Sequence, residues 1–244
     1  MRDFARGTGD FSRGLAIVRR YPDLWKWLLA PALVTLALIA AAIFGIARLV
    51  HPLVAWLVGH LPNFLATAAG ALLEIVVVAA LGLGALLLFT AVAGAIAGPF
   101  NEMLSERIEA HLTGRPEPVF SLPRFLHELS VGIVHGVRRV IIAILGTIVV
   151  FAIGFIPVIG TIAALVLGFW FAARGAAYDC YDAVLARRGL AYREKVAYLE
   201  RHRARSVGLG AVVAALLFVP GLNLVALGLG AAGATVASLD KTQS

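Results

Sequence analysis

Acidic, basic and amide side chains are concentrated between residues 98 and 110, directly after a long apolar run. Glu106 and Glu109 stand three positions apart, so on a helix they share a neighbouring face, with Arg107 beside them. Glutamates at the edge of an apolar run usually pair with cations. We therefore predict a structural ion-pair network here, and the alternative is direct contact with a transported ion. The predicted members are Asn101, Glu106, Arg107, Glu109 and Arg174, with Arg138 and Arg139 as further cations.

Other patterns that could carry chemistry are weak. Gly228, Gly230 and Gly233 have the spacing of a dinucleotide-binding loop, but they follow no predicted strand and no acidic residue stands about 20 positions later. Close helix packing explains these glycines better. Residues 179–182 hold two aspartates and a cysteine but no histidine at ligand spacing. The long apolar runs hold essentially no catalytic groups, so we predict no enzyme, no catalytic residues, no metal and no cofactor.

The composition is that of a membrane protein. Hydrophobic residues make up 61% of the 244 residues and charged residues 14%, against roughly 45–50% and about 25% in soluble domains. A helix that spans the hydrocarbon core needs about 20 apolar residues, and four uncharged runs are that long. These runs are Trp27–Ala47, Ile75–Asn101, Val140–Ala173 and Ser206–Leu239. The predicted fold class is an all-α integral membrane protein.

The first two runs and the last two differ in kind. Residues 27–47 and 75–98 predict two long transmembrane helices, with a loop over 48–74 between them, and Pro99 ends the second helix. The runs 140–173 and 206–239 are each interrupted by a proline, so they predict helical hairpins that enter and leave the membrane on the same side, with partial or full insertion both open. A single kinked helix in each run is the alternative. The predicted turn residues are Pro157, Gly160, Pro220 and Asn223.

The distribution of positive charge favours the hairpins. Lys and Arg number six in residues 1–26, one in 48–74, five in 102–139 and eight in 174–205. Cytoplasmic segments carry the excess of Lys and Arg, so only 48–74 is expected outside. Two hairpins keep both termini and the segments 99–139 and 174–205 cytoplasmic. The net charge is +7, but the basic residues lie beside the apolar runs and form no separate basic domain. No nucleic-acid partner is therefore predicted.

Residues 1–26 have an amphipathic helical pattern. Two rows repeat every seven residues on opposite faces: Phe4, Phe11 and Val18 form one, and Arg6, Arg13 and Arg20 the other. The pattern fits a helix in the membrane interface. It equally fits a helix packed on the cytosolic face of the protein itself. The segment is too long before the first apolar run for an ordinary signal peptide, so an uncleaved first helix is expected.

One longer motif brings these features together. Pro99-Phe100-Asn101-x-x-Leu104-x-Glu106-x-x-Glu109-Ala110-x-Leu112-Thr113-Gly114 resembles the signature of the CysZ sulfate-permease family, which is related to the etoposide-induced 2.4-like membrane proteins. The two proline-centred hairpins resemble that family too, and the similarity runs through nearly the whole chain in order. The resemblance implies a single domain over 1–244, an oligomeric helical bundle, and sulfate uptake that feeds cysteine synthesis.

The resemblance also implies an anion site just before the first transmembrane helix. The family holds sulfate there with backbone amides and an arginine, and the corresponding residues here are 23–26. Asp23 and Trp25 stand where the family has glycine and arginine, which leaves Lys26 with two arginines a turn or two upstream. The predicted anion-binding residues are Arg19, Arg20, Leu24 and Lys26.

These observations predict a passive or proton-coupled permease for a small inorganic oxyanion, sulfate first and sulfite next. The alternative is a non-transporting membrane scaffold whose partner contacts run through 102–139 and 174–205. The expected partners are the lipid bilayer, the anion and further copies of the chain, and the expected location is a bacterial inner membrane.

Overall fold

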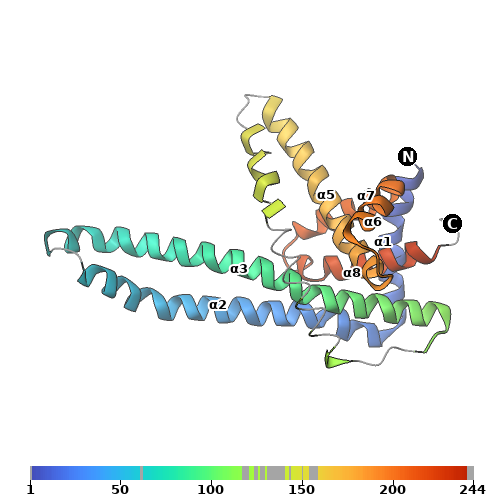
Figure 1. Cartoon of the computed structure of the whole chain (residues 1–244), viewed down its shortest axis with the longest axis horizontal. Coiled ribbons are helices and arrows are strands. Elements are labelled where there is room, and N and C mark those ends of the chain that lie inside the picture. Colours follow the sequence, from blue (N-terminus) through green and yellow to red (C-terminus); the bar gives the residue numbers. More distant parts are fainter. Residues whose placement is uncertain are drawn as a thin grey trace. The chain divides into compact units, whose positions relative to one another are not determined.

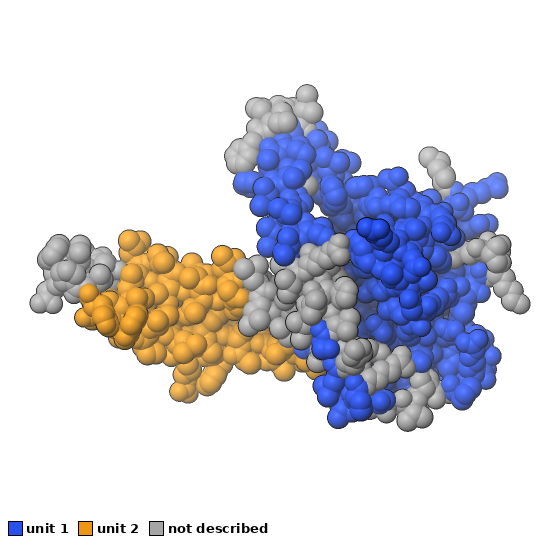
Figure 2. All heavy atoms as spheres, viewed as in Figure 1, with its two compact units in different colours: residues 1–32, 94–244 blue, residues 33–93 orange. Residues whose placement is uncertain are grey.

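Every regular element in the described part of the chain is a helix, as the apolar runs predict (Figure 1). The computed structural model describes residues 2–60, 63–116, 121–123, 126, 130, 141–142, 144–149, 151–153 and 159–240. The elements are α1 (Arg2–Arg20), the 3-10 turn η1 (Pro22–Leu24), α2 (Trp25–Gly59), α3 (Asn63–Thr113), α5 (Ile159–Arg187), α6 (Tyr192–Arg201), α7 (Arg203–Leu217) and α8 (Asn223–Leu239). The chain divides into two compact units, Leu33–Ala93 and the remainder (Figure 2).

The unit Leu33–Ala93 consists of parts of α2 and α3, which run as an antiparallel pair (Figure 1). The predicted helices 27–47 and 75–98 lie inside these two helices. The loop expected over 48–74 is wrong, because α2 continues to Gly59 and α3 begins at Asn63. Arg48, which suggested a loop, stays helical and places its guanidinium carbon 4.8 Å from the centre of the Phe44 ring, one turn earlier. With 35 residues α2 is about 50 Å long, well beyond a hydrocarbon core of about 30 Å.

Pro99 does not end the second predicted helix, contrary to expectation. It lies inside α3, which continues to Thr113. A proline inside a helix costs about 3 kcal/mol. The residues beyond it offset this cost, because the side chains of Leu104 and Ile108 are completely buried against α1, α2 and α8. Helix α3 therefore carries the acidic motif on its last turns rather than on a separate helix.

The other unit, Met1–Ala32 with Gly94–Ser244, has its core where α5, α7 and α8 pack together and α1 covers α7 and α8. Of the two alternatives for residues 1–26, the structure shows the helix packed on the protein itself. Phe11 and Val18 of the apolar row are buried, whereas Phe4 is 43% exposed.

The chain reverses between α7 and α8 as the hairpin interpretation of 206–239 requires. Gly221 has φ +85°, a conformation that residues with a side chain rarely adopt, and it directly follows Pro220. The expected turn residue Asn223 is instead the first residue of α8. In the other predicted hairpin, Pro157 lies outside the described residues, and Gly160 is the second residue of α5.

Within the described residues, two helices are long and apolar enough to cross a membrane. They are Pro22–Gly59, with mean hydropathy 2.4, and Gly160–Arg187, with mean hydropathy 1.4. The second was expected to be the returning arm of a hairpin that ends at residue 173. It continues to Arg187 as one helix, and its part beyond Ala173 is largely buried in the protein core.

Candidate anion site

Three of the residues predicted to bind an anion lie exposed at the junction of α1 and α2. Arg19 and Arg20 are the last two residues of α1, and Lys26 is in the first turn of α2. The guanidinium carbon of Arg20 lies 5.7 Å from the centre of the Tyr21 ring, and Lys26 Nζ lies 6.0 Å from that of Trp27. Among the described residues no carboxylate lies within ion-pair distance of these three cations. Their charge is therefore available to a mobile anion.

The junction is held against the end of α3 through His111. The Tyr21 ring stacks on the His111 ring, with centres 4.2 Å apart and planes 9° apart. His111 Nε2 lies 3.2 Å from Oδ2 of Asp23, within hydrogen-bond distance. Asp23, the acid that stands where an anion site would have glycine, thus has its carboxylate engaged by His111. The three cations are attached to a fixed turn rather than to a loose loop.

Leu24 does not fit its predicted role. Its side chain is completely buried in a cluster with Val18, Leu28 and Leu104. Its backbone N–H donates to the Tyr21 carbonyl at 3.1 Å, which closes the η1 turn. Neither the side chain nor the amide of Leu24 is left for a ligand, because burial of this residue is what anchors the junction.

Glu109, one predicted member of the ion-pair network, pairs with a cation that the sequence analysis does not predict. Arg187 Nη2 lies 3.0 Å from Glu109 Oε2 and donates to the Ser105 hydroxyl at 2.8 Å. Thr235 of α8 donates to the same Ser105 oxygen at 2.7 Å. These hydrogen bonds join the ends of α3, α5 and α8 in a buried polar layer. Arg115 also approaches Glu109, at 3.3 Å on the exposed side.

Arg174, the cation expected in this network, instead pairs with Glu200 of α6. It is 13 positions before Arg187 on α5, so it lies more than three turns away along that helix. Arg138 and Arg139 are outside the described residues.

The remaining predicted members lie on α3 beside α2. Arg107 is 9% exposed and its guanidinium carbon lies 5.0 Å from the centre of the Trp27 ring. Asn101 is buried, with its Oδ1 facing the α8 glycine Gly228, and Glu106 is partly buried. A buried guanidinium on Trp27, the neighbour of Lys26, continues the positive charge of the junction inward.

A second buried ion pair was missed by the sequence analysis. Asp10 and Arg205 connect α1 with α7, and both contribute further contacts to Asp240 or Arg13. The sequence contains a usable signal, because Asp10 shares a helical face with Gly7, Gly14 and the apolar row. An acid on a face of small and apolar residues indicates a buried partner.

The glycines with dinucleotide-like spacing are packing residues, as expected. A Cβ on Gly228 would lie 2.6 Å from Leu28, one on Gly233 would lie 2.9 Å from the Asp10 carbonyl, and one on Gly230 would overlap the Cys180 sulfur. Each of the three glycines lets a different neighbouring element approach α8. No cluster of metal-binding side chains occurs in the part of the chain that the structure describes.

The sequence is similar to those of known proteins over nearly the whole chain. A sequence model of the family described as "Sulfate transporter CysZ/Etoposide-induced protein 2.4" matches residues 10–227. A protein of Pectobacterium atrosepticum named "Sulfate transporter CysZ" is 27% identical over 220 residues, which cover 90% of this chain and 80% of the relative. Proteins of the same name are 26% identical in Vibrio atlanticus, over 94% and 90% of the two chains, and 28% identical in Pseudomonas fluorescens, over 94% and 91%.

Proposed function

This chain belongs to the family of sulfate transporter CysZ and etoposide-induced protein 2.4, and from that premise we propose that it is a membrane permease for a small oxyanion, sulfate first. The family description and the names of the relatives are those of transporters rather than enzymes. We further propose sulfite as a second substrate and a role in sulfur assimilation.

The observation that carries this proposal is the junction of Arg19, Arg20 and Lys26. Three exposed cations within eight residues, with no carboxylate of the described chain in ion-pair distance, make a local field that attracts a dianion. Arginine also offers a planar fork that fits two oxygens of a tetrahedral oxyanion. The engagement of Asp23 by His111 supports the proposal, since it reduces the repulsion that a free carboxylate would exert.

The setting we propose is the bacterial inner membrane, with several passes and both termini in the cytoplasm. The support is the excess of Lys and Arg in all segments except 48–74. We also propose that the chain works as a homo-oligomer, as the family resemblance implies.

The test is uptake of labelled sulfate into proteoliposomes of the purified protein, with sulfite and phosphate as competitors. We expect uptake above that of empty liposomes, and its loss in Lys26→Glu. Arg193→Glu makes the same charge change at an exposed position of α6 away from the junction and serves as the matched control. Uptake that survives in Lys26→Glu would remove the junction from the mechanism.

A second candidate function is a non-transporting membrane scaffold. The observation that favours it is the presence of Asp23 and Trp25 at positions where the family resemblance implies glycine and arginine. Absence of uptake from protein shown to be folded and oligomeric would favour this function. Uptake of labelled sulfate above that of empty liposomes would exclude the scaffold function.

A further inference from the structure

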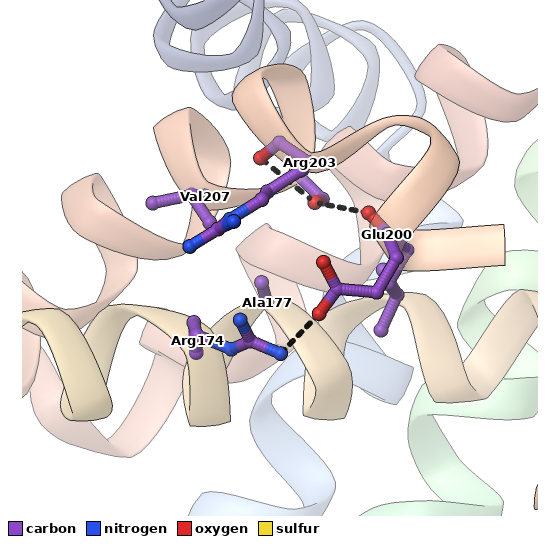
Figure 3. A pocket seen from close by; sticks show the side chains of 7 residues that line it. Arg174, Ala177, Glu200, Arg203 and Val207 are labelled. Carbon is purple, nitrogen blue, oxygen red and sulfur yellow. Dashed lines mark hydrogen bonds and ion pairs between the residues drawn. The ribbon is translucent and has the colours of Figure 1, made fainter. Parts of the chain in front are cut away.

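A small hollow opens where α5, α6 and α7 meet (Figure 3). Its lining combines two arginines and a glutamate with apolar side chains, and Figure 3 shows Arg174 and Glu200 directed toward each other across it. The lining residues are Arg174, Ala177, Leu199, Glu200, Arg203, Ser206 and Val207. None of them belongs to the α1–α2 junction or to the Glu109 network.

The tryptophan one turn before Arg174 fixes both arginines. The guanidinium carbon of Arg174 lies 4.9 Å from the centre of the Trp170 ring, and that of Arg203 lies 5.6 Å from it. Two guanidiniums at one aromatic ring gain cation–π attraction and lose side-chain freedom. The two positive charges, from α5 and from the start of α7, are thus held near one another despite their mutual repulsion.

The hollow has an excess of positive charge. Glu200 pairs with Arg174, with side chains 41% and 35% exposed. Arg203 has no such partner among the described residues, and its guanidinium lies against the Trp170 ring. The Ser206 hydroxyl bonds to the carbonyls of Leu199 and Arg203 and adds no charge. One guanidinium therefore remains for an anionic ligand.

The position of the hollow along α5 indicates where that anion comes from. Up to Phe171 the helix exposes a long series of apolar side chains, and after Arg174 it is largely buried in the protein core. The exposed residues are Ile162, Leu165, Val166, Leu167, Phe169 and Phe171. A tryptophan followed by an arginine at the end of such a series is typical of the level of the lipid headgroups.

We propose that this hollow binds the phosphate group of an anionic phospholipid. Arg203 contacts the phosphate oxygens, Arg174 shares its charge between that phosphate and Glu200, and the acyl chains lie along the exposed apolar side of α5. A phosphatidylcholine headgroup fits less well, because its cationic end would meet the same arginines and the Trp170 ring is already occupied by two guanidiniums. The proposal requires insertion in a membrane and is independent of sulfate transport.

The experiment is native mass spectrometry of the full-length protein in detergent, titrated with palmitoyl-oleoyl phosphatidylglycerol or with phosphatidylcholine of the same chains. We expect the phosphatidylglycerol Kd to be lower by about fivefold, as one guanidinium near an anionic headgroup would give. Arg203→Ala removes this preference, whereas Arg193→Ala, an exposed arginine outside the hollow, keeps it.

Glu200→Gln is expected to strengthen phosphatidylglycerol binding, so this second variant tests the proposal by a gain rather than a loss of binding. It removes the carboxylate that competes for Arg174, so phosphatidylglycerol should bind about threefold more tightly. Equal binding of the two lipids by the wild type, or equal effects of Arg203→Ala and Arg193→Ala, would overturn the proposal. Chloride at equal ionic strength controls for charge screening. If sulfate displaces more phosphatidylglycerol than this chloride control does, the hollow binds a free oxyanion instead.

Discussion

Asp10 of α1 and Arg205 of α7 form a buried ion pair across 195 positions of sequence. Arg205 Nε donates to Oδ2 at 2.6 Å and Nη2 donates to Oδ1 at 2.9 Å, with the two side chains 8% and 1% exposed. Arg205 Nη2 also donates to Asp240 at 3.1 Å, just after α8. The hydrogen bonds to Asp10 raise the pKa of the Arg205 guanidinium above its ordinary value, so it stays charged at all relevant pH values. Arg205 thereby connects Asp10, near the start of the chain, with Asp240, near its end.

Replacing Asp10 with alanine should be strongly destabilising. The change leaves the Arg205 charge buried beside Asp240 alone, and breaking a buried pair costs about 3–5 kcal/mol. We expect a clearly lower apparent melting temperature in detergent, measured by size-exclusion chromatography after heating. Asp3→Ala removes an exposed i, i+3 pair with Arg6 and should change stability by less than about 1 kcal/mol. Equal effects of the two variants would contradict a structural role for Asp10.

Gly14→Ala should separate α1 from α8. A Cβ at Gly14 would overlap the backbone of Gly233, which cannot move aside as a flexible side chain could. We expect the free energy of unfolding to fall by about 2 kcal/mol or more, since overpacking costs about 1–3 kcal/mol even where side chains can adjust. Gly9→Ala is the matched control, because nothing lies within 4 Å of its Cβ position. Alanine should there stabilise the helix by up to about 1 kcal/mol, so the two variants should shift the melting temperature in opposite directions.

Thr235→Val tests the polar layer between α3 and α8. Valine keeps the shape but loses the hydroxyl that donates to Ser105, in a completely buried position. We expect the free energy of unfolding to fall by about 1–2 kcal/mol. Thr113→Val removes an exposed hydroxyl that donates to the Glu109 carbonyl, and it should be nearly neutral. A neutral Thr235→Val would mean that this hydrogen bond adds nothing to stability.

Labelling of an introduced cysteine tests the predicted topology. His60 lies in the segment expected outside, so His60→Cys should react in intact cells with an impermeant maleimide. Ala191 lies in a segment expected in the cytoplasm, so Ala191→Cys should react only after the membrane is permeabilised. Both positions are exposed, and the native Cys180 is completely buried, so the unlabelled wild type sets the background. Labelling of Ala191→Cys from outside would mean that the run 140–173 crosses the membrane once.

The sulfate KM, measured in proteoliposomes whose cytoplasmic face is outward, should depend on ionic strength if the junction cations attract the anion. The Debye length falls from about 30 Å at 0.01 M to about 10 Å at 0.1 M, so KM should rise about threefold over this range. Sodium gluconate supplies the salt without adding a competing oxyanion. In the triple variant Arg19→Gln, Arg20→Gln, Lys26→Gln, KM should be high and nearly independent of salt. A wild-type KM that does not change with ionic strength would contradict electrostatic capture at this junction.

The helices were predictable because their signals are local, whereas their ends were not. Long apolar runs identify α2 and α3, and the i, i+4 spacing of Leu104 and Ile108 identifies the buried side of the α3 end. Pro99 and Arg48 are ordinary signals for a helix end. Both were overridden here, Pro99 by burial of the residues that follow it, and Arg48 by its position over Phe44 on a helix longer than the membrane is thick.

The partners within the candidate site were less predictable than its members. Glu109 was expected to pair with a cation, but the choice between Arg174 and Arg187 depends on how α5 lies against α3, which no local pattern encodes. Leu24 was assigned to the anion site by its position in the motif, and the structure buries it. Asp10 was missed because its partner is far away in sequence.

The docking of α1 through glycines also has a consequence for the order of events during synthesis. The carbonyl of Arg205 lies where a side chain on Gly7 would be, so α1 reaches its final place only when residues almost 200 positions later exist. At a ribosomal rate of about 5–20 residues per second, that delay is about 10–40 s. During it, Phe11 and Val18 have no protein surface to cover them, and the lipid interface is the apolar surface at hand. We expect the newly made helix to rest on the membrane first and to dock only when the last hairpin emerges.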